Sequence, residues 1–319
     1  MELYNLKKDK VEEVKLIPFK LEGDIQTLVE KNTEVIFQLE TIQSEFTVKN
    51  YRIDTLCLDI ENNSFVIIEY KRGKSDSVID QGMTYLQLLL NNKDNFILKL
   101  SQYYNKVLTL KDIDWTQSKV IFVAESYSSY QKDSVNFKNL PFELWEIKKF
   151  SNNTVVFNRH KSDSKESIET FTDPKKQSAL SIINKEIKVY NEEDVISKTD
   201  KNILDKWNKL KEYMSELSGT ELTPKRNYIS LMLNNKTVAY FNFFKQKMRV
   251  DFARGNVNQD GSKSKNYFNL DDPKKISYER SWTWKGGTKG TVYKVPILKD
   301  TDTDYLIFLI KQKYNNLRQ

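Results

Sequence analysis

Three charged residues with the chemistry of a metal-assisted hydrolase lie close together in the sequence: Asp54, Glu69 and Lys71. Paired carboxylates supply the hard oxygen ligands that Mg²⁺ prefers, and a nearby ammonium group orients water or neutralises charge developing on a phosphate. Gln81 and Tyr85 follow four residues apart, a spacing that places both on one face of a helix. The pattern is therefore suited to a divalent-cation site with a lysine that can act on water or on a phosphate.

Two apolar, β-prone runs, residues 52–60 and 65–71, carry the three charges. Asn62 and Asn63 lie between them and tolerate the positive φ of a tight turn. A two-residue loop there predicts these opposed pairs: Glu61 with Ser64, Leu56 with Glu69, and Asp54 with Lys71. Since opposed residues share a face, the three charged side chains should converge on one side of the sheet. A three-residue loop would instead turn Asp54 away and make Asp59 the partner carboxylate.

The order of these residues resembles the PD-(D/E)XK nuclease superfamily, in its RecB-like branch. Asp54 matches the motif Asp, Glu69-Tyr70-Lys71 the (D/E)XK element and Gln81-x-x-x-Tyr85 the extra helical motif, while Ile53 replaces the motif Pro. The resemblance covers about residues 15–125. It implies an α/β fold, restriction-endonuclease-like, in which a mixed sheet is flanked by helices.

The resemblance also assigns roles within the site. Asp54 and Glu69 are expected to hold Mg²⁺, with Mn²⁺ as an alternative, and Lys71 is expected to orient the attacking water. The first helix of such nucleases adds one more Glu, for which Glu22 is the first choice and Glu30 the second. Gln81 and Tyr85 would position the substrate strand or support the metal ligands. Taken alone, a Gln and a Tyr at the spacing of Gln81 and Tyr85 more often form only a helix-surface pair, and Glu22 equally fits a carboxylate favoured by the helix dipole.

Composition excludes several other chemistries. The 319 residues include one cysteine, Cys57, and one histidine, His160, so neither a disulfide nor a Cys/His zinc site forms within the chain. His160 is expected in an exposed linker. Neither a P-loop nor a Gly-x-Gly-x-x-Gly fingerprint is present. No apolar run is long enough to cross a membrane, and the N-terminal residues lack the apolar core of a signal peptide, which favours a cytoplasmic protein.

Hydrophobic periodicity predicts three regions: a nuclease-like domain over 1–158, a polar linker and helical segment over 159–218, and a small basic α+β accessory domain over 219–319. Expected helices span about 24–39, 78–91, 175–217 and 303–317, and expected strands about 120–124, 142–147, 155–157, 228–233, 238–244 and 247–252. The region of about 227–317 resembles a small domain of unknown function that is attached to such nucleases and sometimes labelled "predicted transport protein". That resemblance transfers no catalytic residue.

Positive charge gathers in the last third of the chain. Residues 224–319 hold 19 Lys and Arg against 8 Asp and Glu, a net charge of +11 within a whole-chain charge of +7. Such an excess suits a polyanion such as DNA. Proposed nucleic-acid contacts are Arg72, Lys74, Trp282, Trp284, Lys285 and Lys289. Aromatic rings among lysines can stack bases and bind phosphates, although a Trp pair on one strand face more often belongs to a core.

Together these patterns predict a metal-dependent DNA endonuclease acting in defence or repair. Two alternatives stay open: a catalytically inactive DNA-binding or scaffold protein that keeps the fold, and a ribonuclease that uses the same site. Fold analogy suggests a homodimer. A protein or a small molecule is the alternative partner of the C-terminal region.

Overall fold

The computed structural model describes residues 2–60, 62–71, 78–136, 140–160, 183, 186–234, 236–264, 267–283 and 289–318. The chain divides into two compact units, Met1–Val189 and Tyr190–Gln319. Among the described residues, no helix is both long and apolar enough to cross a membrane.

The first unit is built on a seven-stranded sheet with the order β3-β8-β7-β6-β5-β4, to which β9 is added beside β8. The strands β6, β7 and β8 are parallel and the other pairs antiparallel, so the sheet is mixed. Their bounds are β3 Leu16–Ile17, β4 Glu40–Val48, β5 Tyr51–Asp59, β6 Ser64–Lys71, β7 Lys119–Ala124, β8 Phe142–Phe150 and β9 Val155–His160. Strands β6 and β7 are almost continuously apolar because both faces of the sheet are covered.

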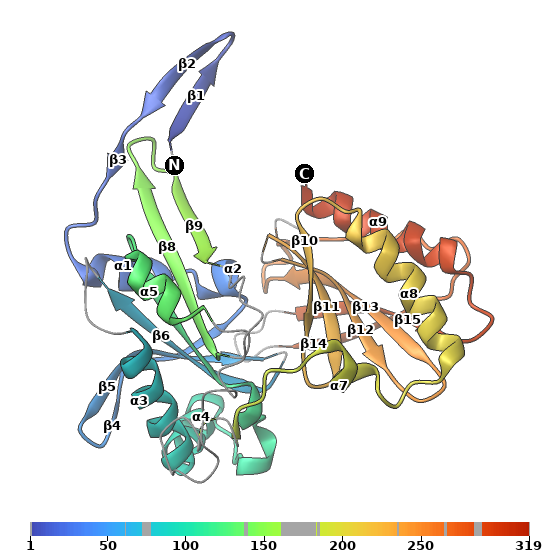
Figure 1. Cartoon of the computed structure of the whole chain (residues 1–319), viewed down its shortest axis with the longest axis horizontal. Coiled ribbons are helices and arrows are strands. Elements are labelled where there is room, and N and C mark those ends of the chain that lie inside the picture. Colours follow the sequence, from blue (N-terminus) through green and yellow to red (C-terminus); the bar gives the residue numbers. More distant parts are fainter. Residues whose placement is uncertain are drawn as a thin grey trace. The chain divides into compact units, whose positions relative to one another are not determined.

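Helices cover the two faces of this sheet (Figure 1). Helices α3 (Val78–Asn91) and α4 (Lys93–Tyr104) pack on the face that contains Leu56, Ile67 and Phe122. Helix α1 (Glu22–Glu30) packs on the opposite face, against Cys57 and Ile68. Short elements complete the unit: α2 (Thr33–Phe37), α5 (Ser129–Ser134) and the 3-10 turns Leu110–Asp112 and Trp115–Gln117. The predicted fold class, α/β with a helix-flanked mixed sheet, is confirmed.

Two expectations about the first unit are corrected. The helix expected over 24–39 is broken into α1 and α2, because the Asn32 amide donates to Leu28 O at 2.7 Å and ends the first helix. His160 is the last residue of β9 rather than part of an exposed linker, and it is half-buried. Ahead of the sheet, β1 (Leu3–Lys7) and β2 (Lys10–Val14) form a separate hairpin that projects from the rest of the unit (Figure 1).

The β5–β6 hairpin has a different register from the predicted one. Asp59 pairs with Ser64, so Leu56 lies opposite Ile67 rather than Glu69. The turn begins early because Asp59 accepts hydrogen bonds from Asn62 N at 3.1 Å and from Asn62 Nδ2 at 2.6 Å. The predicted pairing of Glu61 with Ser64 is therefore wrong, and Glu61 itself lies outside the described residues. A shift of two residues preserves the alternation, so Asp54 keeps the face of Glu69.

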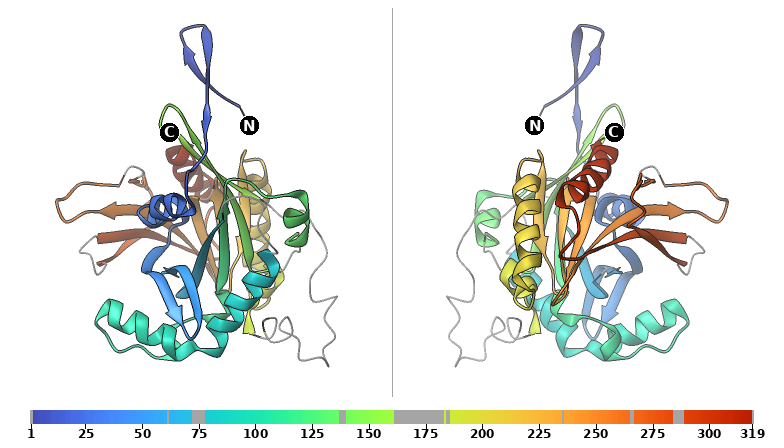
Figure 2. Two further views of the ribbon diagram at one scale, coloured as in Figure 1. Left: turned by 90° about the vertical axis from the view of Figure 1, so that its left-hand side faces the viewer. Right: turned by 90° about the vertical axis from the view of Figure 1, so that its right-hand side faces the viewer.

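The second unit contains a six-stranded antiparallel sheet with the order β10-β11-β12-β13-β15-β14. Its elements are α7 Glu192–Ile196, α8 Lys201–Ser215, β10 Thr220–Pro224, β11 Tyr228–Leu233, β12 Lys236–Phe243, β13 Met248–Val257, β14 Tyr278–Thr283, β15 Lys289–Ile297 and α9 Thr303–Arg318. Helices α8 and α9 lie side by side on one face of the sheet (Figure 2). Helix α8 was expected in a segment between two domains, but its Trp207 and Leu210 are fully buried in the core of this unit.

A half-buried ion cluster connects β8 to its neighbours. The Glu143 carboxylate lies 2.6 Å from Lys119 Nζ and 3.5 Å from Arg159 Nε, and it accepts a hydrogen bond from Trp145 Nε1 at 3.0 Å. Burial alone would raise the pKa of Glu143, but the two cations and the indole donor outweigh it and hold that pKa well below its usual range.

We expect Lys119→Met to lower the free energy of unfolding by about 2 kcal/mol, between the values for an exposed and a fully buried pair, because the pair is partly buried and Arg159 and Trp145 remain as partners. Urea denaturation measures the change. Lys111→Met, at an exposed site, is the control and should change stability little. Equal stability of the two variants would contradict a role for this cluster in holding the sheet together.

Candidate active site

The candidate site lies where β5 and β6 meet the start of α3. Continuing the β5–β6 register by one residue sets Asp54 opposite Glu69, and Lys71 shares the face of Glu69 by strand alternation. Helix α3 lies over this face and presents Gln81 from its first turns. The structure thus brings the predicted carboxylates, lysine and helical amide together.

The centre of the site is the Glu69 carboxylate, which is only 4% exposed. Its Oε1 accepts hydrogen bonds from Lys71 Nζ at 3.0 Å and from Gln81 Nε2 at 2.5 Å. Its Oε2 is buried, and no described residue donates a hydrogen bond to it. A buried anionic oxygen without a partner is costly, so this atom is suited to accept a water or a cation.

Gln81 and Tyr85 connect α3 to the two strands. Gln81 Nε2 lies 3.2 Å from Tyr85 OH, and that hydroxyl donates to Arg52 O at 3.3 Å. Burial and the Glu69 charge raise the pKa of Tyr85, so its hydroxyl remains a proton donor. Gln81 and Tyr85 are therefore not merely a pair on a helix surface, because together they orient one oxygen of Glu69.

Asp54 is held by the backbone of the neighbouring strand, since its Oδ2 accepts a hydrogen bond from Tyr70 N at 3.1 Å. Burial and the nearby Glu69 charge raise the pKa of Asp54 to about 7, against the lowering effects of the Tyr70 N–H and of Lys71. Glu22, in the first turn of α1, also raises this pKa. Glu22 is therefore within electrostatic reach of Asp54, although its side chain is exposed.

Glu30 makes its hydrogen bonds on the opposite face of the sheet. Its Oε1 accepts hydrogen bonds from Thr55 Oγ1 at 2.6 Å and from Gln26 Nε2 at 3.1 Å. Thr55 follows Asp54 in β5 and so points to the other side. Glu30, the second choice for the additional ligand, is thus directed away from the Asp54 carboxylate, and we leave it out of the proposed ligand set.

A buried polar chain behind the site was missed by the sequence reasoning. Thr55 Oγ1 lies 3.0 Å from Tyr70 OH, so one hydroxyl links Tyr70 to Glu30. The backbone N–H of Tyr70 meanwhile holds Asp54. Tyr70 is the variable position of the motif, so the motif gave no signal for it. The polar Thr55 within an apolar strand was the one available sign.

The residues of the site fit a hard divalent cation. No group of three or more His, Cys, Asp or Glu that could hold a metal is assembled among the described residues. Mg²⁺ does not need one, because it keeps several waters and is commonly held by one or two carboxylates. The unpartnered Glu69 Oε2 and the facing Asp54 carboxylate supply such a pair.

The proposed nucleic-acid contacts are mostly beyond the described residues, which do not include Arg72, Lys74, Trp284 and Lys285. The backbone of Trp282 pairs with Gly290 between β14 and β15, but its side chain is not described. Lys289 is exposed at the start of β15.

Comparison with known proteins finds a relative that matches along the whole chain. A protein of Haemophilus influenzae strain Rd, described as uncharacterized, is 35% identical over 316 residues, which cover 98% of this chain and 99% of that protein. No protein-family model matches.

Two weaker likenesses are to solved structures. EndoMS in its apo form is 19% identical with a TM-score of 0.28, over 46% of this chain and 64% of its own. A repair endonuclease from Pyrococcus abyssi is 21% identical with a TM-score of 0.23, over 41% of this chain and 49% of its own. The chain thus spans less than two thirds of either solved chain.

The raised pKa of Asp54 predicts an unusual pH dependence of stability without metal. Between pH 3.8 and about 7 the native state holds more protons at Asp54 than the unfolded state does, so this contribution to stability should fall as the pH rises. We expect the difference in unfolding free energy between the wild type and Asp54→Asn, measured with urea in EDTA, to decline across this window.

Asp9→Asn, at an exposed position of the β1–β2 hairpin, is the matched control and should give a nearly constant difference. If the Asp54→Asn difference is equally constant with pH, the described electrostatics of Asp54 are incorrect.

Proposed function

We propose that this chain, which belongs to the same family as the uncharacterized Haemophilus influenzae protein, is a metal-dependent DNA endonuclease. The proposal depends mainly on one observation. The buried Glu69 carboxylate uses one oxygen for Lys71 and Gln81 and leaves the other without a partner, beside the facing carboxylate of Asp54.

In the proposed site, Asp54 and Glu69 would hold Mg²⁺ or Mn²⁺, with Glu22 near enough to add its charge. Such an ion polarises a phosphoryl oxygen and favours attack by water. Release of the Asp54 proton would precede binding, because a carboxylate binds a cation in its ionised form. Glu22 would increase the negative potential there without being buried itself.

Lys71 would orient the attacking water and neutralise charge on the phosphate. Its ammonium group is fixed by Glu69 Oε1, and 18% of its side chain remains exposed, so it is held in place while still reaching the surface. Gln81 and Tyr85 would keep Glu69 in the rotamer that leaves Oε2 available. Lys71, Gln81 and Tyr85 would thus position the water, the phosphate and the Glu69 carboxylate, and none of them would carry out a separate chemical step.

DNA as the substrate is supported by the resemblance of the motif and by charge. The second unit, Tyr190–Gln319, holds 24 Lys and Arg against 16 Asp and Glu, a net charge of +8, whereas the first unit is close to neutral. We infer that the second unit adds phosphate contacts to a site in the first. Digestion of single-stranded DNA, duplex DNA and RNA, each with Mg²⁺, Mn²⁺ or EDTA, distinguishes a deoxyribonuclease from a ribonuclease and from an inactive DNA-binding protein.

Substitution of the site residues tests the chemistry. Glu69→Gln and Lys71→Met should each reduce Mg²⁺-dependent nicking of a supercoiled plasmid by about 10²-fold or more, the reduction typical when one group that stabilises the transition state is removed. The unfolding transition of each variant is measured as a check on folding. The exposed-site variant Lys111→Met should cleave like the wild type. Wild-type rates for folded Glu69→Gln would remove this glutamate from the mechanism.

Neutralisation of exposed cations tests the role of the second unit. Arg280 and Lys289 are exposed on the adjacent strands β14 and β15. The double variant Arg280→Gln with Lys289→Gln is titrated with DNA at several salt concentrations. The slope of the logarithm of the DNA-binding constant against the logarithm of the salt concentration should become shallower by about 0.9 for each phosphate that these side chains neutralise in the wild type. Lys8→Gln with Lys10→Gln removes the same charge from the first unit and is the control. An unchanged slope in the first pair would favour a protein or small-molecule partner for this unit.

A further inference from the structure

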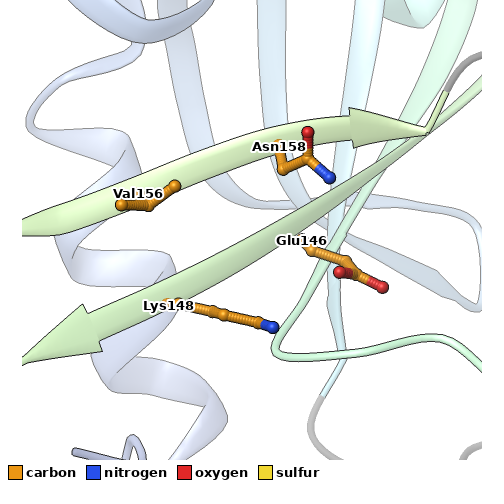
Figure 3. Close-up of a pocket in the computed structure, with 4 residues that line it drawn as sticks. All are labelled: Glu146, Lys148, Val156 and Asn158. Carbon is orange, nitrogen blue, oxygen red and sulfur yellow. The ribbon is translucent and has the colours of Figure 1, made fainter. Parts of the chain in front are cut away.

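A cavity of about 220 Å³ lies on strands β8 and β9 of the first unit (Figure 3). Glu146 and Lys148 line it from β8, and Val156 and Asn158 line it from β9. The register pairs Glu146 with Asn158 and Lys148 with Val156, so all four side chains belong to one face of the hairpin. None of these residues belongs to the proposed metal site.

The cavity shares a sheet face with that metal site. The strand pairings place Lys71, Ala124, Glu146 and Asn158 in one row across β6, β7, β8 and β9. Neighbouring strands are about 4.8 Å apart, so Glu146 lies roughly 10 Å from Lys71 across the sheet, and Asn158 one strand further. At about 3.4 Å per nucleotide along one strand of a duplex, a separation of roughly 10 Å corresponds to about three nucleotides.

The lining is polar but nearly balanced in charge. Glu146 is held by Lys132 Nζ at 2.8 Å and by Tyr127 N at 3.4 Å, so its carboxylate is a fixed acceptor. Lys148 adds a donor, Asn158 adds a donor and an acceptor, and Val156 adds an apolar contact. A phosphate would meet the Glu146 carboxylate, and a cation would meet the Lys132 and Lys148 ammonium groups, so a neutral polar ligand fits best.

We propose that this cavity binds one nucleobase of the substrate strand, near the phosphate that the Asp54/Glu69 site would cleave; this inference rests on the proposed function. The volume is below the 300–1,000 Å³ typical of pockets for drug-sized ligands, so it suits a single ring system rather than a whole nucleotide.

The side chains also indicate which bases fit. A carboxamide pairs with the N6 and N7 edge of adenine, and a carboxylate accepts from the exocyclic amine of cytosine. Asn158 and Glu146 together therefore favour adenine or cytosine, which carry the N6 or N4 amine at the edge that these groups contact, over thymine. Val156 packs against the ring, and the cavity makes the position of cleavage depend on the base bound there.

Binding in EDTA tests the cavity independently of cleavage. The full chain is titrated with fluorescein-labelled oligothymidylate that is uniform or carries one central dA or dC, both as a single strand and as a duplex. Wild type should bind the dA or dC strand at least about 5-fold more tightly, the lower end for one bidentate base contact. Asn158→Leu should abolish this preference, and Asn95→Leu, exposed on α4, should retain it.

Cleavage in Mg²⁺ forms the second arm. Cuts should occur at a fixed offset from the dA or dC in wild type and become scattered in Asn158→Leu. No base preference in either form of oligonucleotide, or the same preference in Asn158→Leu, would overturn the cavity proposal. A base preference in EDTA without any cleavage in Mg²⁺ would instead retain the cavity and reject the nuclease.

Discussion

Burial of the Glu69 carboxylate is the constraint on which the rest of the site depends. A charge at 4% exposure must be compensated by partners, and the largely apolar strand β6 supplies only one of them. Lys71 supplies one from the same strand, and Gln81 supplies the other from α3. Helix α3 must therefore lie close enough to β6 for Gln81 to reach Glu69 Oε1. The remaining oxygen, Glu69 Oε2, defines where a cation would bind.

Tyr70 connects the two faces of the sheet at this point. Its backbone N–H holds Asp54 on the α3 face, and its hydroxyl meets Thr55 and, through it, Glu30 on the α1 face. Contiguous hydrogen bonds therefore connect α1 to Asp54. The position that the motif leaves variable is, in this chain, the one that fixes β5 against β6.

Strand alternation extends the same organisation along the sheet. The row that begins at Lys71 continues to Glu146 and Asn158, so chemistry and base recognition would share one rigid support. Sites built on strands hold their geometry more closely than sites on loops. The second unit has its own core around Trp207 and carries the positive charge, so in the proposed function affinity for a polyanion would be separate from the carboxylate site.

Local patterns in the sequence determined the helix over 78–91, the shared face of Asp54, Glu69 and Lys71, and the proximity of Gln81 to them. The first two follow from periodicity, which a short segment carries by itself. The register was set by the local hydrogen bonds between Asp59 and Asn62, which periodicity does not reveal, together with a tertiary contact in which Asp114 N donates to Asn63 O at 2.7 Å. Tertiary structure also decided the direction of Glu30 and the membership of α8 in the second core. Which oxygen of Glu69 stays unpartnered depends on a contact between β6 and α3, and such contacts between separate segments arise only when the chain folds.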